Sequence, residues 1–442
     1  MIQIMLLLFG VEFVRDKAKY LMLFGILWSV LGVSIFVDGL DGVTYFPLRT
    51  FGGLLLLESL VTLSIASGGV GAQKVVLYFK GGSFCFVAIL ILPDKPYSNL
   101  LLAIIFGLIL FVIGLFVISS AWVVRYPQWK RTILSGAAQI LFALFMFNPY
   151  PTHYKATVPV FLGTLMLISG INTMRLALRA SQVREGGSIF YLLAPCALRY
   201  DFKEHPTPPP DDHNGVRTDF SGPLTVHIWT PEGTANTSPI PRPVINRYIA
   251  AVDTDGVIST GHAALELQPD IYISLYPLAD IDRSPSEFLN TLKATQDNNV
   301  PGMFQPDYTT EVANWCYSDR KILFYQYNGM ALQQYWQSCR MNTTYNLTYR
   351  NCSSSVAYAL EASLEGVLSD QSKNLRATLR TLFMPELWIA AQLRKRALSM
   401  AWTPGLVMDY SRALRSIVHP ESEPWYQRLS DKWRERQRAR RS

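Results

Sequence analysis

Apolar residues are unevenly distributed along the chain. Before Arg179 long apolar stretches alternate with short polar connections, whereas Pro, Asp, Asn and Gln occur throughout the remainder. A helix needs about 20 largely apolar residues to cross a bilayer, and stretches of suitable length lie at 20–37, 48–66, 75–92, 100–124, 133–147 and 157–178. The pattern predicts a membrane domain of six spans within residues 1–184, followed by a soluble part.

Residues 1–19 are too short to add a further span, and they lack the basic start and small-residue cleavage site of a signal peptide. An interfacial helix is expected there. The connections after the first, third and fifth spans carry Asp38 and Asp41, then Asp94 with Lys95, then only His153 and Lys155. Basic residues mark the other side of the spans: Arg15, Lys17, Lys19, Lys74, Arg125, Lys130, Arg131, Arg179 and Arg184. Because basic connections stay inside, both termini are expected in the cytoplasm, at a bacterial inner membrane.

Glycines repeat within the predicted spans. The positions Pro93, Gly107 and Gly114 recur 56 residues later as Pro149, Gly163 and Gly170, and Gly25 and Gly32 show the same glycine spacing. Glycines seven apart share a helix face and allow a neighbouring helix to approach closely. The unit suggests three helical hairpins. Glu58, inside the second span, is a functional candidate unless it pairs with Lys80.

These positions resemble the HdeD-type acid-resistance membrane proteins of bacteria. The resemblance is carried by WKRTILSGAAQILFALFMFNP and VFLGTLMLISGINTMRLALR and covers roughly residues 15–180. It implies a membrane topology rather than a reaction. A non-enzymatic stress-resistance role, with a soluble binding domain, therefore stays open.

The second half of the chain reads as an α+β domain over residues 224–370. Period-two alternation and β-branched residues predict strands at 224–231, 248–253, 261–267, 270–278 and 320–327, and helical spacing predicts helices at 284–295 and 330–341. Residues 185–223, which include HPTPPPDDHNG, read as a linker or membrane-proximal segment.

A cysteine at a helix start is the first candidate for chemistry. Val356, Leu360 and Leu364 define a helix face, and Asn351 is a suitable N-cap and a possible oxyanion donor. Cys352 would then occupy the first turn, where free N–H groups and the helix dipole favour a thiolate. A lowered thiol pKa is expected. The plain alternative is a core cysteine.

His262 is the candidate base, in GHAALEL at the start of a strand. An imidazole on a strand facing the helix start would accept the thiol proton and form a dyad. Glu266 on the same strand and Ser274 on the next are candidates for orienting the ring. A polar core histidine is the alternative. The remaining cysteines and histidines lack metal-ligand spacing, so no metal or cofactor is expected, and five cysteines, an odd number, suit a reducing compartment.

The order of these motifs resembles the circularly permuted branch of the papain-like superfamily. That branch includes permuted NlpC-type peptidases, the lecithin:retinol acyltransferase family and related bacterial amidases. GHAALEL corresponds to the histidine strand and YNLTYRNCSSSVAYALE to the cysteine helix, over about residues 224–368. The resemblance implies a cysteine hydrolase or acyltransferase (a thiol peptidase, amidase or thioesterase) with catalytic Cys352 and His262 and an acyl-enzyme intermediate. A membrane-proximal peptide, protein or lipid is the expected substrate.

Two further segments are left with open roles. Residues 371–442 form a basic helical tail in which Leu387, Ala391 and Leu398 alternate with Arg394 and its basic neighbours. Such a helix either lies on an anionic bilayer or docks on the protein, and lipid is a more economical partner for the tail than nucleic acid. The phrases DNNVPGMF and EVANWCYSD suggest no chemistry. Asn298, Asn299 and Trp315 are either residues that shape a substrate cleft or ordinary loop and core residues.

Overall fold

The computed structural model describes residues 1–40, 45–68, 72–150, 154–183, 187–195, 220, 222–230, 251–252, 258–279, 281 and 288–420. These residues form two compact units. Unit 1 contains Met1–Val14, Ser119–Arg131 and Val183–Pro420, and unit 2 contains Arg15–Ile118 and Thr132–Gln182. The first fourteen residues thus group with the second half of the chain and not with the spans that follow them.

Within the described residues, six helices are long and apolar enough to cross a membrane. They are α1 (Ile2–Asp38), α2 (Leu48–Gly68), α3 (Ala72–Ile91), α4 (Pro96–Val124), α5 (Trp129–Phe147) and α6 (Thr157–Ala180). Each predicted apolar stretch lies within one of these helices or overlaps it almost completely. The chain is therefore a multi-pass membrane protein by the length and composition of its helices.

Glycines mark the closest approaches between helices of unit 2. A Cβ added to Gly163 would lie 2.6 Å from the carbonyl oxygen of Gly32, and one added to Gly170 would lie 2.7 Å from that of Gly25. Gly114 of α4 faces Gly136 of α5 in the same way, at 2.9 Å. Helices α1 and α6, and α4 and α5, thus meet backbone to backbone, because no side chain intervenes.

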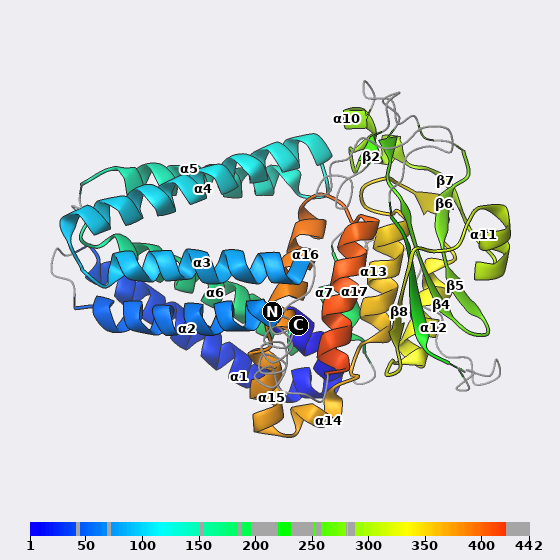
Figure 1. Cartoon of the computed structure of the whole chain (residues 1–442), viewed down its shortest axis with the longest axis horizontal. Helices are drawn as coiled ribbons and strands as arrows, with labels where there is room; N and C mark the ends of the chain where they lie inside the picture. Colours follow the sequence, from blue (N-terminus) through cyan, green and yellow to red (C-terminus); the bar gives the residue numbers. More distant parts are fainter. Residues whose placement is uncertain are drawn as a thin grey trace, which may run out of the picture. The chain divides into compact units, whose positions relative to one another are not determined.

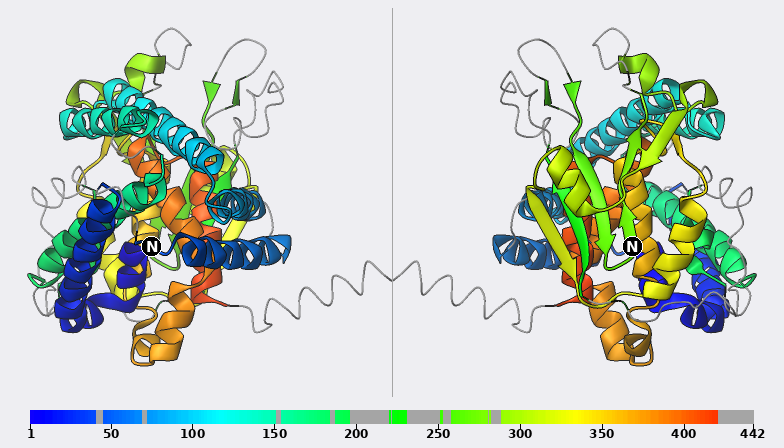
Figure 2. Two further views of the ribbon diagram at one scale, coloured as in Figure 1. Left: turned by 90° about the vertical axis from the view of Figure 1, so that its left-hand side faces the viewer. Right: turned by 90° about the vertical axis from the view of Figure 1, so that its right-hand side faces the viewer.

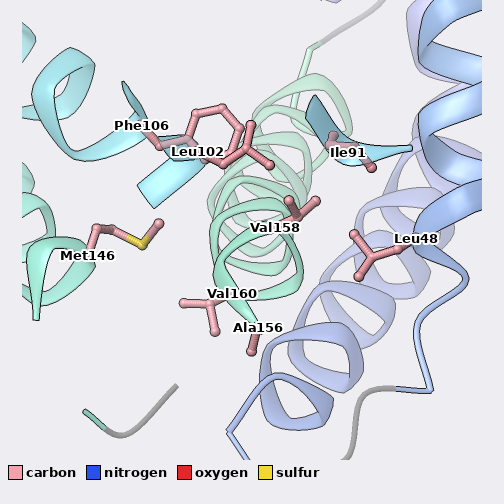
Figure 3. Close-up of a cluster of buried hydrophobic side chains, with 8 residues drawn as sticks. All are labelled: Leu48, Ile91, Leu102, Phe106, Met146, Ala156, Val158 and Val160. Carbon is pink, nitrogen blue, oxygen red and sulfur yellow. The ribbon is translucent and has the colours of Figure 1, made fainter. Parts of the chain in front are cut away.

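Unit 2 contains a buried apolar cluster and a partly exposed ion pair between two helices. The cluster joins α2 to α6 through buried side chains (Figure 3): Leu48, Ile91, Leu102, Phe106, Met146, Ala156, Val158 and Val160. The Lys80 Nζ of α3 lies 2.6 Å from the Glu58 Oε1 of α2. Glu58 therefore has the cationic partner expected of a carboxylate inside a span.

Unit 1 contains two main antiparallel sheets. The first has the order β5–β4–β1–β8, and the second has the order β6–β7–β9. Their strands are β1 (Leu224–Trp229), β4 (His262–Leu267), β5 (Ile271–Ile273), β6 (Leu275–Pro277), β7 (Val300–Phe304), β8 (Arg320–Phe324) and β9 (Thr344–Tyr345); β2 (Ala251–Val252) and β3 (Ile258–Ser259) form a separate pair. The stretch expected as one strand at 270–278 is divided at Ser274 into β5 and β6, which belong to different sheets. Most of the segment expected as a strand at 248–253 and the first residues of the helix expected at 284–295 lie outside the described residues.

Helices cover both faces of the first sheet. Figures 1 and 2 show α13 and α17 on one side and α11 on the other. The helices of unit 1 are α7 (Ile189–Leu193), α10 (Phe288–Thr291), the 3-10 turn η1 (Gln296–Asn298), α11 (Tyr308–Asn314), α12 (Gly329–Cys339), α13 (Cys352–Ser363), α14 (Ser369–Ser372), α15 (Leu375–Leu382), α16 (Pro385–Ser399) and α17 (Pro404–Val418).

A buried ion pair connects the helical part of unit 1. Arg394 of α16 lies 2.7 and 2.9 Å from the two carboxylate oxygens of Glu361 on α13, and the Tyr410 hydroxyl of α17 donates to the same carboxylate. Arg394 also donates to the carbonyl oxygen of Leu193. Helix α16 is therefore docked on the protein through Arg394, which is one of the two alternatives expected for that segment.

The start of α1 completes unit 1. The amide of Gly366 donates to the Leu7 carbonyl, and the amide of Leu368 donates to the Leu8 carbonyl. Helical geometry breaks at Gly10, where φ is +83° and where an added Cβ would lie 2.8 Å from the Gly366 Cα. Only glycine combines that conformation with so close an approach. Met1–Val14, the larger part of the segment expected to lie at the membrane interface, thus packs within unit 1.

Candidate functional site

Cys352 is the first residue of α13, as the sequence predicts. The Asn351 side chain accepts a hydrogen bond from the Ser354 amide, and the Ser354 side chain accepts one from the Asn351 amide, which makes a complete capping box. The Asn351 Nδ2 donates to the carbonyl oxygens of Leu347 and Trp402. Asn351 therefore holds the helix start in place, and its amide donors are engaged there rather than directed at an oxyanion.

The Cys352 thiol is held between backbone donors but is nearly buried. Hydrogen bonds from the amides of Ala263 and Ser353 favour the thiolate, and Sγ lies 3.7 Å from the Ser353 Oγ. Only 7% of the residue is exposed. Loss of hydration outweighs the donors, so burial raises the pKa of Cys352 above its usual value. The expected lowering of the thiol pKa is therefore wrong, because the helix start is covered rather than open to solvent.

His262 is the first residue of β4 and is 4% exposed. Its Nε2 lies 2.8 Å from the Ser274 Oγ and 3.3 Å from the Glu311 Oε1, and the Tyr276 ring stacks on the imidazole with centroids 4.1 Å apart. Burial lowers the pKa of His262 to about 3. The negative charge of Glu311 favours the protonated imidazole, but this carboxylate also accepts hydrogen bonds from two tyrosine hydroxyls. The effect of burial is therefore the larger one, and the neutral imidazole is the resting form.

Glu311 of α11 connects the polar groups around this ring. The Tyr272 hydroxyl donates to its Oε2 at 2.5 Å, and the Tyr276 hydroxyl donates to its Oε1 at 2.7 Å. Burial and the adjacent carboxylate raise the pKa of both tyrosines, so they remain donors. A carboxylate only accepts hydrogen bonds, and it therefore favours the tautomer that carries its proton on Nε2 of His262. Nδ1 is then the basic nitrogen.

The chain brings the thiol to the edge of β4 beside His262. His262 is the cross-strand partner of Trp229 on β1, and both side chains lie on the α11 face of the sheet. Helix α13 packs on the other face (Figure 1). The Cys352 Sγ reaches the strand edge at the Ala263 amide and interacts electrostatically with Glu311 and with Tyr276. Among the described residues, the imidazole is hydrogen-bonded to Ser274 and lies 3.3 Å from the Glu311 carboxylate, and no hydrogen bond joins it to the thiol.

The edge exists because β5 pairs with only the second half of β4. The pairing of β4 with β5 stops at Leu265 and Ile273, and the chain then turns at Ser274 into the second sheet. The first residues of β4 are thus free of a neighbour on that side and receive the start of α13. Ser274, at the turn, is fully buried and holds the His262 ring.

The other expected site residues have different contacts. Glu266 lies 3.0 Å from the His227 Nε2, so its recorded histidine partner is His227, not His262. Trp315 is exposed and stacks on Trp229 with centroids 5.5 Å apart, and its ring lies 6.2 Å from that of His262. Trp315 therefore forms an aromatic border of the site.

The two asparagines hold loops and contribute nothing to the site. The Asn298 Nδ2 donates to the carbonyl oxygens of Asn290 and Lys293, and the Asn299 Oδ1 accepts from Asn346 and Tyr349. Both side chains are thus engaged in shaping the connections that flank β7.

Sequence reasoning missed Glu311 and Tyr276. Glu311 lies in the EVANWCYSD segment, on a short helix that follows its N-cap Asp307. The available signal was an acidic residue on a short helix with an apolar neighbour, which is common on protein surfaces. Only the packing of α11 against the sheet makes Glu311 a buried partner of His262.

Comparisons with protein-family models, with curated proteins and with solved structures gave no match. The fold and the site of this chain are therefore described from its own residues alone.

Proposed function

We propose that this protein is a membrane-anchored cysteine hydrolase or acyltransferase in which Cys352 is the nucleophile and His262 the base. The observation that carries the proposal is the cluster at the edge of β4. A helix-start cysteine lies beside a histidine whose Nε2 is held by Ser274 and Glu311, so Nδ1 is the basic nitrogen. A nucleophile, a base and a group that orients the base are the three parts of such a site.

In the proposed reaction the His262 Nδ1 takes the proton of the Cys352 thiol while Sγ attacks the carbonyl carbon of an amide, ester or thioester. The electron pair of the carbonyl moves to its oxygen, and the amides of Ala263 and Ser353, which donate to the thiol in the free protein, are the donors proposed for that oxyanion. The intermediate then collapses, the bond to the leaving group breaks, and His262 returns the proton to that group. Water or another nucleophile releases the acyl group from Cys352 by the same steps in reverse.

The electrostatics favour general-base catalysis over a standing ion pair. Burial raises the pKa of Cys352 and lowers that of His262, so thiol and imidazole are both neutral at rest. When the proton moves, the new imidazolium lies 3.3 Å from the Glu311 carboxylate. Glu311 therefore stabilises the charge that the reaction creates. A thiol–imidazole hydrogen bond has to form first, by rotation of side chains when substrate binds.

A non-catalytic binding role is the second candidate. It is favoured by one observation, the low exposure of Cys352 and His262, which are 7% and 4% exposed. In that case the six spans anchor a binding domain whose cysteine and histidine serve packing alone, as in a stress-resistance protein. The two candidates differ in whether an acyl group is ever attached to Cys352.

The decisive experiment traps that acyl group. The full chain in lipid nanodiscs is mixed with a panel of activated acyl thioesters and peptidyl and fatty-acyl amides, quenched in acid and digested for mass spectrometry. We expect acylation of Cys352 that is lost in His262→Ala, with exposed Cys316 as the internal control for simple thiol chemistry. If Cys316 and Cys352 are acylated equally, and His262→Ala does not change this, the catalytic proposal is wrong and the binding role remains.

The same proposal places the site in the cytoplasm of a bacterium, at its inner membrane. The support is the distribution of basic residues along the connections. Reporter fusions after Arg179 and after Asp38 are expected to report opposite sides of the membrane. A periplasmic signal from the first fusion would reverse the orientation and expose Cys352 to an oxidising compartment.

A further inference from the structure

Helix α15 presents an apolar face to solvent. Leu375 is 72% exposed and Phe383, which caps the helix, is 77% exposed, with exposed Leu379 between them. Residues four apart lie on one side of a helix, so the three side chains form a single stripe. Thr381 on another side of the helix is buried. The helix is thus held to unit 1 by one side and leaves its apolar side uncovered.

Basic side chains flank the stripe. Arg376 and Arg380 each follow one of its leucines and are exposed, and α15 contains no acidic residue. An apolar stripe bordered by arginines fits the surface of an anionic bilayer, where the apolar groups enter the boundary of the acyl chains and the cations meet the phosphates. A protein partner would not by itself require this charge.

The position of α15 along the fold points to the same surface. Lys373, just before α15, interacts electrostatically with Glu12 of α1, and Gly366 and Leu368, just before α14, bond to the Leu7 and Leu8 carbonyls. From Glu12 the chain continues as one helix into the apolar stretch of α1, which is long enough to span a membrane. The segment that α15 adjoins is therefore the segment that leads into the bilayer.

We propose that α15 is a membrane-docking helix that inserts Leu375, Leu379 and Phe383 into a bilayer surface containing anionic phospholipid. The docking does not depend on the chemistry at Cys352. It gives the soluble unit a second attachment besides its covalent links to the spans, and it locates in α15 the surface role that the sequence suggested for the wider basic tail.

Photo-crosslinking in nanodiscs tests the proposal with the full chain. Phe383→p-benzoylphenylalanine and, as the matched control, Tyr317→p-benzoylphenylalanine replace two aromatic residues of similar exposure, 77% and 76%. After irradiation in nanodiscs that contain phosphatidylglycerol, we expect phospholipid adducts at position 383 and not at position 317. Equal lipid adducts at both positions, or adducts at 383 to protein instead of lipid, would overturn the proposal.

Charge reversal separates docking from chance contact. Arg376→Glu with Arg380→Glu is expected to lower the lipid adduct at 383 by about five-fold for each positive charge lost in phosphatidylglycerol nanodiscs, and far less in phosphatidylcholine alone. Lys395→Glu with Arg396→Glu makes the same change on exposed residues of α16 and is expected to leave the adduct unchanged. Equal losses from both pairs of substitutions would mean that α15 has no special part in lipid contact.

Discussion

His227 and His262 lie on the same face of the same sheet, on neighbouring strands, yet their surroundings differ in one respect. His227 is bonded at both ring nitrogens, with Nδ1 at 3.2 Å from the Ser318 Oγ and Nε2 at 3.0 Å from the Glu266 Oε2. In the described part of the chain, His262 has its polar contacts at Nε2, with a hydrogen bond to Ser274 and the Glu311 carboxylate at 3.3 Å. An imidazole that is hydrogen-bonded at both nitrogens serves a structural role, whereas an imidazole that is held at one nitrogen can exchange a proton at the other.

Aromatic packing sharpens this contrast. The Tyr308 ring stacks on His227 with centroids 4.0 Å apart, and the Lys321 Nζ lies 4.4 Å from the centre of the Tyr308 ring. His262 is instead stacked on Tyr276, which interacts with Cys352 and with Glu311. On the proposed function the two histidines would have different roles, because a thiol lies beside His262 and not beside His227 in the described residues.

The largest expected difference concerns acyl transfer. His262→Ala is expected to slow acylation of Cys352 by about 10²–10⁴-fold, because the proton no longer has an acceptor. His227→Ala, which removes a ring of the same kind from the same face, is expected to change the rate by less than about 10-fold. Single-turnover acylation, followed by mass spectrometry of the Cys352 peptide, measures both. Similar losses in the two variants would end the distinction between the histidines.

The pH dependence of local stability gives the second difference. The unfolded chain protonates His262 near 6.5 and the folded chain near 3, so the unfolded state binds more protons between these values. Stability is therefore present above pH 6.5 and is lost as pH falls. Between pH 6.5 and 4 the loss is expected to be about 3 kcal/mol. Hydrogen exchange of β4 amides measures it, and His262→Gln is expected to remove most of the slope.

Spans and the start of α13 were predictable from the sequence, because both depend on neighbours along the chain. A stretch of about twenty apolar residues is buried either in a bilayer or in a protein core. An Asn before a helical pattern is a local signal for a helix N-cap. The burial of Cys352 was not predictable, since α13, β4 and α11 come from distant segments. The contact of Glu311 with His262 was not predictable for the same reason.

Alternation along β4 predicted the correct face for Glu266 but not its partner. The strand period places Glu266 on the side of His262, four residues away, and the neighbouring strand β1 brings His227 closer. Likewise, alternation over 270–278 predicted one strand, and only the pairing of β6 with β7 shows that the chain changes sheets at Ser274. Strand pairing is set by tertiary packing and not by the period.

A stability loss is expected where the structural histidine is removed. His227→Ala takes away the buried partner of Glu266 and of Ser318 and leaves a cavity beneath Tyr308. Unpaired polar groups cost about 1–3 kcal/mol each when buried, so a loss of about 2 kcal/mol is expected in β1. Hydrogen exchange of the β1 and β8 amides reports it. Unchanged protection would show that His227 contributes nothing to the sheet.

The smallest expected effect tests the orienting carboxylate. Glu311→Gln keeps the shape and an acceptor for one tyrosine hydroxyl but removes the negative charge beside His262. Acylation of Cys352 is expected to fall by about 10-fold, because the imidazolium formed in the reaction is less stable. Asp307→Asn, at the N-cap of the same helix, is the control for damage to α11. If the control lowers the rate as much as Glu311→Gln does, the charge has no role of its own.

The bonds from Gly366 and Leu368 to the carbonyls of Leu7 and Leu8 have a consequence for biogenesis. Leu7 and Leu8 are synthesised before the rest of the six apolar helices, and their partners Gly366 and Leu368 follow only after all six helices have been made. At about 5–20 residues per second, the first apolar turn of α1 waits on the order of tens of seconds for the segment that covers it. During that interval a chaperone or the insertion machinery has to shield it.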